Sequence, residues 1–89
     1  MEAKTKLADF FRAEPSVQFQ ILFKDGELFI MRSISSALLN IEGVLCGTIV
    51  EVVKTIKKHP LKPEGMMDFE FKDIAEVTNL QTKQLIKFN

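Results

Sequence analysis

The chain has 89 residues, of which 46% are hydrophobic and 27% are charged, and this balance predicts one folded globular domain over residues 1–89. No run approaches the roughly 18 consecutive apolar residues that a membrane helix needs, so we expect no membrane partner. Twelve basic and twelve acidic residues cancel to a formal net charge of zero. No overall field therefore draws the protein to nucleic acid or anionic lipid, and any such binding must use a local patch.

The N-terminal residues predict a short amphipathic helix over residues 3–13. Leu7, Phe10 and Phe11 stand at helical spacing among charged side chains, and Pro15 ends the element. Because so short a helix is marginal alone, we expect it to dock on an open end of the sheet that follows. The charges in this segment do not fit a secretory signal, and we expect a cytoplasmic protein.

The next stretch predicts a β-hairpin with strands over residues 16–24 and 27–35. Apolar and polar residues alternate from Val17 to Phe23, which is the period of two of a half-buried strand. Asp25-Gly26 then supplies two residues that tolerate the positive φ of a tight type I′ turn. The second strand is again rich in β-forming residues, so the turn fixes the register of the pair.

Two interpretations remain open for residues 36–46. Serines before Ala-Leu-Leu are typical of a helix start, which favours an α+β fold with a helix in this range. Gly43 and Gly47 would fall inside that helix, however, and the residues that follow are mostly β-branched. We therefore favour strands over residues 39–45 and 47–56, joined at a glycine bend that lets a small sheet curl.

Two prolines and a glycine predict an exposed loop over residues 57–66. We interpret His59 in this loop as solvated rather than catalytic. Beyond the loop, aromatic and charged residues alternate and predict a strand over residues 67–77 with its aromatic face inward. The tail from Asn79 onward fits a last helical turn or a strand equally well.

The residue inventory contains no constellation for catalysis. The chain has one His, one Cys, no Tyr and no Trp, and it lacks a Gly-rich phosphate loop and metal-ligand spacing. We expect no enzyme activity, no catalytic residue, no metal and no cofactor. The lysines of the loop are either a soluble loop tip or a strip of phosphate contacts.

The order of these elements resembles that of the Sm-like (Lsm) family. A short helix, an alternating strand, Lys24-Asp25-Gly26, a return strand, Leu39-Asn40 in a turn, and two more strands separated by a variable loop cover nearly the whole chain. The first motif corresponds to the family's Asp-Gly turn and the second to its Met-Asn. The resemblance implies a mostly β fold in which the short N-terminal helix precedes a strongly bent five-stranded antiparallel Sm-like barrel.

The resemblance also implies a function. Sm-like proteins close into homo-oligomeric rings by pairing edge strands between subunits, and their turns line a pore that binds single-stranded RNA. On this pattern the RNA-binding residues are Leu39, Asn40, Lys72 and Asp73, the last two near the place of the family's Arg-Gly. We therefore expect a ring protein of RNA metabolism that pairs with copies of itself, for example through an open edge strand over residues 48–56.

Three departures from the family pattern support an alternative hypothesis. Met31 stands where the family has a glycine, Ser36 or Ala37 stands where it has an aspartate, and Lys72-Asp73 replaces its Arg-Gly. The alternative is a structural or assembly module that uses the same edge pairing without nucleic acid.

Overall fold

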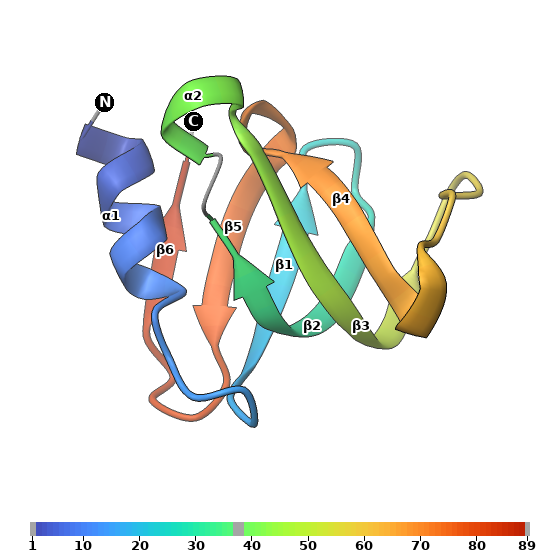
Figure 1. Ribbon diagram of the computed structural model, residues 1–89, viewed down its shortest axis with the longest axis horizontal. Helices are drawn as coiled ribbons and strands as arrows, with labels where there is room; N and C mark the ends of the chain where they lie inside the picture. Colours follow the sequence, from blue (N-terminus) through green and yellow to red (C-terminus); the bar gives the residue numbers. More distant parts are fainter. Residues whose placement is uncertain (1, 37–38, 89) are drawn as a thin grey trace.

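A computed structural model describes residues 2–36 and 39–88, without the side chains of residues 2, 40 and 41 (Figure 1). The elements are α1 (Glu2–Phe10), β1 (Gln18–Phe23), β2 (Leu28–Ser35), α2 (Leu39–Glu42), β3 (Val44–Lys54), η1 (Pro63–Gly65), β4 (Met66–Glu70), η2 (Phe71–Asp73), β5 (Ile74–Asn79) and β6 (Leu85–Lys87). All six strands belong to one antiparallel sheet in the order β4-β3-β2-β1-β5-β6. The mostly β class and the short N-terminal helix are therefore confirmed.

The predicted hairpin is formed by β1 and β2, with Phe19 opposite Met31 and Ile21 opposite Phe29 in the core. The turn differs from the type I′ turn that we predicted. Of its residues only Gly26 has a positive φ, 98°, and the N–H of Phe23 donates to the carbonyl oxygen of Glu27 at 2.9 Å. These features are those of a three-residue hairpin loop whose last residue takes the left-handed conformation.

The sheet curls until strands that are not neighbours in it touch. Phe23 of β1 and Phe69 of β4 are separated by two strands in the sheet order, yet their ring centroids lie 5.7 Å apart. Gly47 of β3 permits close approach to β2, because a Cβ there would lie 3.0 Å from side-chain atoms of both Met31 and Ile34. The core therefore lies inside the curl.

The helix α1 packs on the side of the curled sheet opposite the projecting loop after β3 (Figure 1). Its Leu7 and the following Phe11 are buried, and the rings of Phe11 and Phe19 lie 5.0 Å apart in an edge-to-face contact. The apolar stripe read from the sequence thus meets the core, as expected. Within residues 2–36 and 39–88, no helix is long and apolar enough to cross a membrane.

The strand predicted over residues 39–45 is wrong at its start, where the structure has the short helix α2. Leu39 is fully buried, and the N–H of Gly43 donates to its carbonyl oxygen at 3.0 Å. Gly43 has a φ of 72°, a left-handed conformation that ends the helix. The alternative helix around residues 36–46 was correct in type but far too long, since β3 runs unbroken from Val44 to Lys54.

The strand predicted over residues 67–77 is divided into β4 and β5 by the turn η2. Phe69 and Ile74 are both buried, and residues five apart in one strand would face opposite sides of the sheet. A turn between them is therefore required. The tail forms β6 against β5, so residues 2–36 and 39–88 form six strands rather than the predicted five.

The alternation in β1 predicts opposite effects for two neighbouring substitutions. Phe19 is buried and Gln18 is exposed. Phe19→Ala should lower the free energy of unfolding by about 3–5 kcal/mol, and Gln18→Ala should change it by less than about 0.5 kcal/mol. Urea denaturation measures both values, and equal losses would contradict this register.

Candidate functional site

Glu27 is the polar side chain that the described structure buries completely, with 1% of its surface exposed. It stands between the turn after β1 and the first residue of β2. Its position is two residues before Phe29 and four before Met31, which both face the core. The same alternation therefore points the Glu27 side chain inward. A buried carboxylate is costly unless donors surround it.

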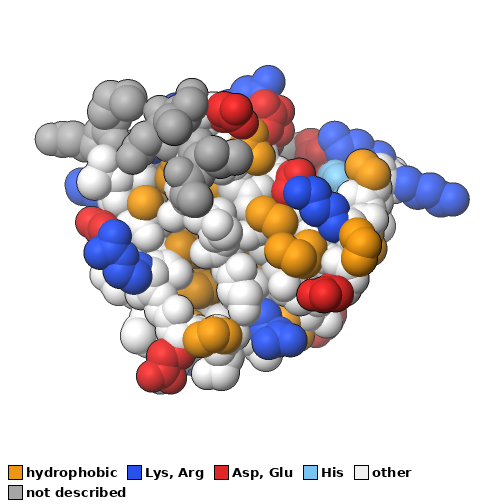
Figure 2. Space-filling model, in the orientation of Figure 1, with side chains coloured by type: hydrophobic (Ala, Val, Ile, Leu, Met, Phe, Trp, Pro, Cys, Tyr) orange, Lys and Arg blue, Asp and Glu red, His pale blue; other side chains and the backbone are white. Residues whose placement is uncertain are grey.

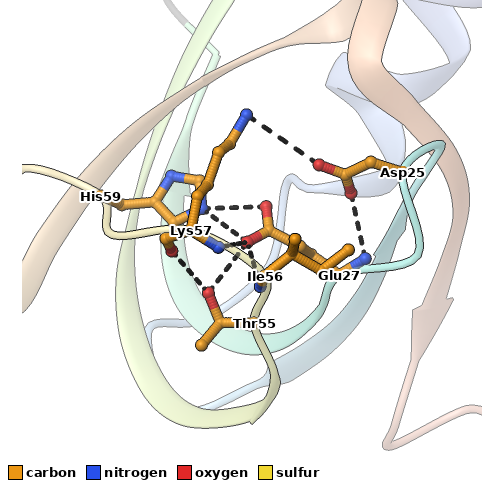
Figure 3. A network of polar contacts seen from close by, with 6 residues as sticks. All are labelled: Asp25, Glu27, Thr55, Ile56, Lys57 and His59. Atoms are coloured by element: carbon orange, nitrogen blue, oxygen red, sulfur yellow. Dashed lines mark hydrogen bonds and ion pairs between the residues drawn. The ribbon is translucent and has the colours of Figure 1, made fainter.

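Four groups from the segment after β3 surround this carboxylate (Figure 3). The N–H groups of Ile56 and Lys57 donate to Oε2 at 3.0 and 3.4 Å, and His59 Nε2 lies 2.9 and 3.0 Å from the two oxygens. The Thr55 hydroxyl lies 2.8 Å from Oε2 and 2.7 Å from the Lys57 carbonyl oxygen, so one hydrogen serves two acceptors. We call residues 55–59 with Glu27 the carboxylate anchor.

Burial alone would raise the pKa of the Glu27 carboxyl, because it removes water from the charged form. The hydrogen bonds from Ile56, His59, Thr55 and Lys57 outweigh that effect and lower the pKa from its ordinary value of 4.5 to about 2. The carboxylate is therefore ionised at neutral pH and accepts hydrogen bonds only. His59 Nε2 must then carry a hydrogen, whichever charge the ring has.

The interpretation of His59 as a solvated loop residue is wrong. Its side chain is 20% exposed, and its ring packs edge-to-face on Phe29 with centroids 5.4 Å apart. The nearby ion pair between Lys57 Nζ and Asp25, at 3.9 Å, is exposed and adds little. In the predicted loop over residues 57–66, residues 57–58 and 60–64 are exposed, and His59, Gly65 and Met66 are partly buried.

Two hollows border the carboxylate anchor. One has a volume of about 430 Å³ and is lined by Phe23, Met67 and Phe69 and by charged side chains that include Asp73. The other, of about 410 Å³, is an apolar groove; its lining includes Phe29, Ile49, Val52, Ile56, Leu61 and Lys58. Among the described residues, no group of three or more His, Cys, Asp or Glu side chains is placed to hold a metal ion.

The residues that the resemblance assigns to RNA binding have unequal surroundings. Leu39 is fully buried, so its side chain has no surface to offer a ligand. The side chain of Asn40 lies outside the described part of the structure. Lys72 and Asp73 are exposed in η2, and Lys72 Nζ lies 3.7 Å from a carboxylate oxygen of Glu70.

Backbone hydrogen bonds nevertheless bring the two predicted turns together. The N–H of Phe71, at the start of η2, donates at 2.7 Å to the carbonyl oxygen of Gly43, the residue after α2. Lys4 Nζ of α1 lies 5.8 Å from the centroid of the Phe71 ring. One lysine from α1 and one from η2 thus flank this junction, with the acidic Glu70 and Asp73 beside them.

Comparison with protein-family models, with curated protein sequences and with solved structures found no match to this chain. The geometry of the described residues is therefore the basis for any assignment.

Replacement of Glu27 by Gln should reduce stability at pH 7 and flatten its acid dependence. The folded pKa is below the ordinary value, so the contribution of this carboxylate is complete above pH 4.5 and is lost as the pH falls to about 2. A shift of this size corresponds to about 3 kcal/mol. We expect Glu27→Gln to cost about 2–3 kcal/mol at pH 7.

Urea denaturation between pH 7 and pH 2 measures this dependence in the wild type, in Glu27→Gln and in a control, Glu14→Gln. The control makes the same chemical change at an exposed position, so its pH profile should follow the wild type. If the wild type and Glu27→Gln lose equal stability on acidification, the carboxylate is not held as described.

Proposed function

We propose that this chain is a divergent Sm-like module that assembles with copies of itself through the two end strands of its sheet. The observation that carries the proposal is the strand order, in which β4 and β6 each pair with one neighbour only among the residues that the structure describes. An end strand that lacks a second neighbour presents unpaired N–H and C=O groups to another chain. Two such strands at opposite ends of one curled sheet allow a head-to-tail contact that repeats from copy to copy.

The charges of the two end strands are complementary. Asp68 and Glu70 are exposed on β4, whereas Lys87 is exposed on β6 and Lys83 in the turn before it. Leu85 of β6 is also 45% exposed, which gives this short strand an apolar contact. The carboxylates already pair with Lys62 and Lys72 at the surface, but such exposed pairs exchange partners at little cost.

The assembly proposal predicts a multimer in solution at micromolar concentration. Light scattering coupled to size exclusion measures the mass directly. Leu85→Lys places a charge on the edge of β6 and should shift the mass toward that of a monomer. Gln81→Lys adds the same charge in the exposed turn before β6 and should leave the mass unchanged. A wild-type monomer would contradict the proposal.

Single-stranded RNA is the second candidate ligand, and the proximity of the two turns supports it. Lys4 and Lys72 at the junction between Gly43 and Phe71 would contact phosphates, and assembly would repeat that contact in every copy. The exposed carboxylates of Glu70 and Asp73 oppose it. We therefore rank assembly without nucleic acid above RNA binding.

Fluorescence anisotropy with short U-rich and A-rich RNAs at low salt tests the second candidate. Lys72→Ala should weaken binding to both RNAs and lower the salt slope by about one. Lys6→Ala removes an exposed lysine of α1 that lies about 200° around the helix axis from Lys4, and it is the matched control. If no RNA binds at tens of micromolar protein, assembly alone remains.

A further inference from the structure

The large exposed hydrophobic side chains are concentrated in one part of the chain. Six are more than 40% exposed among the described residues, and five of them lie between positions 50 and 61: Val50, Val52, Val53, Ile56 and Leu61. Figure 2 shows hydrophobic side chains gathered, with basic ones among them, over the part of the surface where Figure 1 draws β3 and the loop that follows. An apolar patch rimmed by charge is typical of an interaction site.

The backbone of β3 is also open along this patch. β4 pairs only with residues 44–48 of β3, so among the described residues β2 is the single strand beside residues 49–54. Their outward N–H and C=O groups can accept a further strand. A ligand that satisfies such an edge must itself carry a peptide backbone, which an acyl chain does not.

The adjoining apolar groove supplies the space for side chains. It has a volume of about 410 Å³. Phe29, Ile49 and Val52 line it from the strands, and Ile56 and Leu61 line it from the segment that follows β3. An incoming strand places alternate side chains on one face. Apolar residues at every second position would therefore enter the groove together.

Lysines surround this groove and edge. Lys57 and Lys58 belong to the lining, and Lys54 is the last residue of β3. Neither Lys54 nor Lys58 forms an ion pair with another described residue, whereas Lys57 and Lys62 have surface partners. The exposed acidic side chain in β3 is Glu51. Lysine stems lie along apolar surface while their ammonium groups reach water, so these charges stand at the rim of the groove. There they favour carboxylates on the side of the ligand that faces solvent.

We infer that residues 49–54 of β3 and the apolar groove dock an extended segment of another protein, which alternates apolar and acidic residues and joins β3 as an added strand. A second copy of this chain does not fit as well. The apolar Met67 and Phe69 of β4 are buried in their own core, and the exposed charge of β6 is basic. This site is separate from the end strands used in the proposed assembly.

The carboxylate anchor explains how the groove keeps its shape. Glu27 binds the backbone of residues 56 and 57 and the side chain of His59, so the wall that carries Ile56 is ordered before a ligand arrives. The Ile56 side chain remains 62% exposed, so its own burial does not hold this wall in place. A wall held in place during folding loses less conformational entropy on binding.

The probe that tests this inference is an eight-residue peptide in which Val or Ile alternates with Glu or Asp, capped at both ends. Two matched peptides replace either the acidic residues with Lys or one central apolar residue with Pro, which cannot complete a strand ladder. Titration of ¹⁵N-labelled full-length protein should shift the amide signals of residues 49–54. The Lys and Pro peptides should bind about tenfold more weakly or not at all.

Protein variants locate the site. Lys58→Glu, an exposed change, should weaken the acidic peptide about fivefold, the equivalent of one charge pair. Val52→Lys should weaken it about tenfold or more, and Gln81→Lys should have no effect. Unchanged affinity in Lys58→Glu and Val52→Lys would overturn the assignment, as would equal binding of the Lys or Pro peptide.

Two other results would also overturn the inference. One is binding of vesicles that contain phosphatidylglycerol, with no shift from any peptide, because the site would then recognise a lipid surface. The other is a fall in the solution mass of the protein on Val52→Lys but not on Leu85→Lys, because a second copy would then occupy this edge. Absence of shifts at millimolar acidic peptide contradicts it directly.

Discussion

The burial of one carboxylate constrains the rest of this structure. Glu27 lies inside the curled sheet with 1% of its surface exposed, and an unpaired charge there would cost several kcal/mol. Its donors come from residues 55–59, directly after β3. Residues 55–58 stay at the surface, and their hydrogen bonds to Glu27 fix the start of the segment that leads from β3 to β4. The position of His59 and the wall of the apolar groove formed by residues 55–59 therefore depend on this anchor.

Local pattern was enough to predict the elements whose partners are close in sequence. The hairpin and the inward face of β1 followed from alternation and from Asp25-Gly26, although the turn itself has a different geometry. The helix α2 was only an alternative, because the helix signal of the serines before Ala-Leu-Leu competed with the β-branched residues that follow; Gly43, in the left-handed conformation, keeps the helix to Leu39–Glu42. The division between β4 and β5 did have a signal, since Phe69 and Ile74 stand five residues apart and cannot share a face of one strand.

The candidate site was only partly accessible from sequence. Glu27 was not singled out from the sequence, although a signal was present: Glu27 lies two residues before Phe29 and four before Met31, and strand alternation puts it on the same face. Its partners were hidden because two of them are backbone N–H groups, which any residue supplies. His59 stood among prolines and lysines that favour solvent, and only the fold brings it to Phe29. The roles of Asn40, Lys72 and Asp73 in RNA binding stay predictions.

Amide hydrogen exchange tests the anchor most directly. The N–H groups of Ile56 and Lys57 donate to the Glu27 carboxylate, whereas that of Lys58 has no acceptor in the described part of the chain. At neutral pH we expect Ile56 and Lys57 to exchange much more slowly than Lys58, and we expect Glu27→Gln to remove the difference. Equal, fast exchange of all three amides in the wild type would show that the segment is not held and would contradict this account.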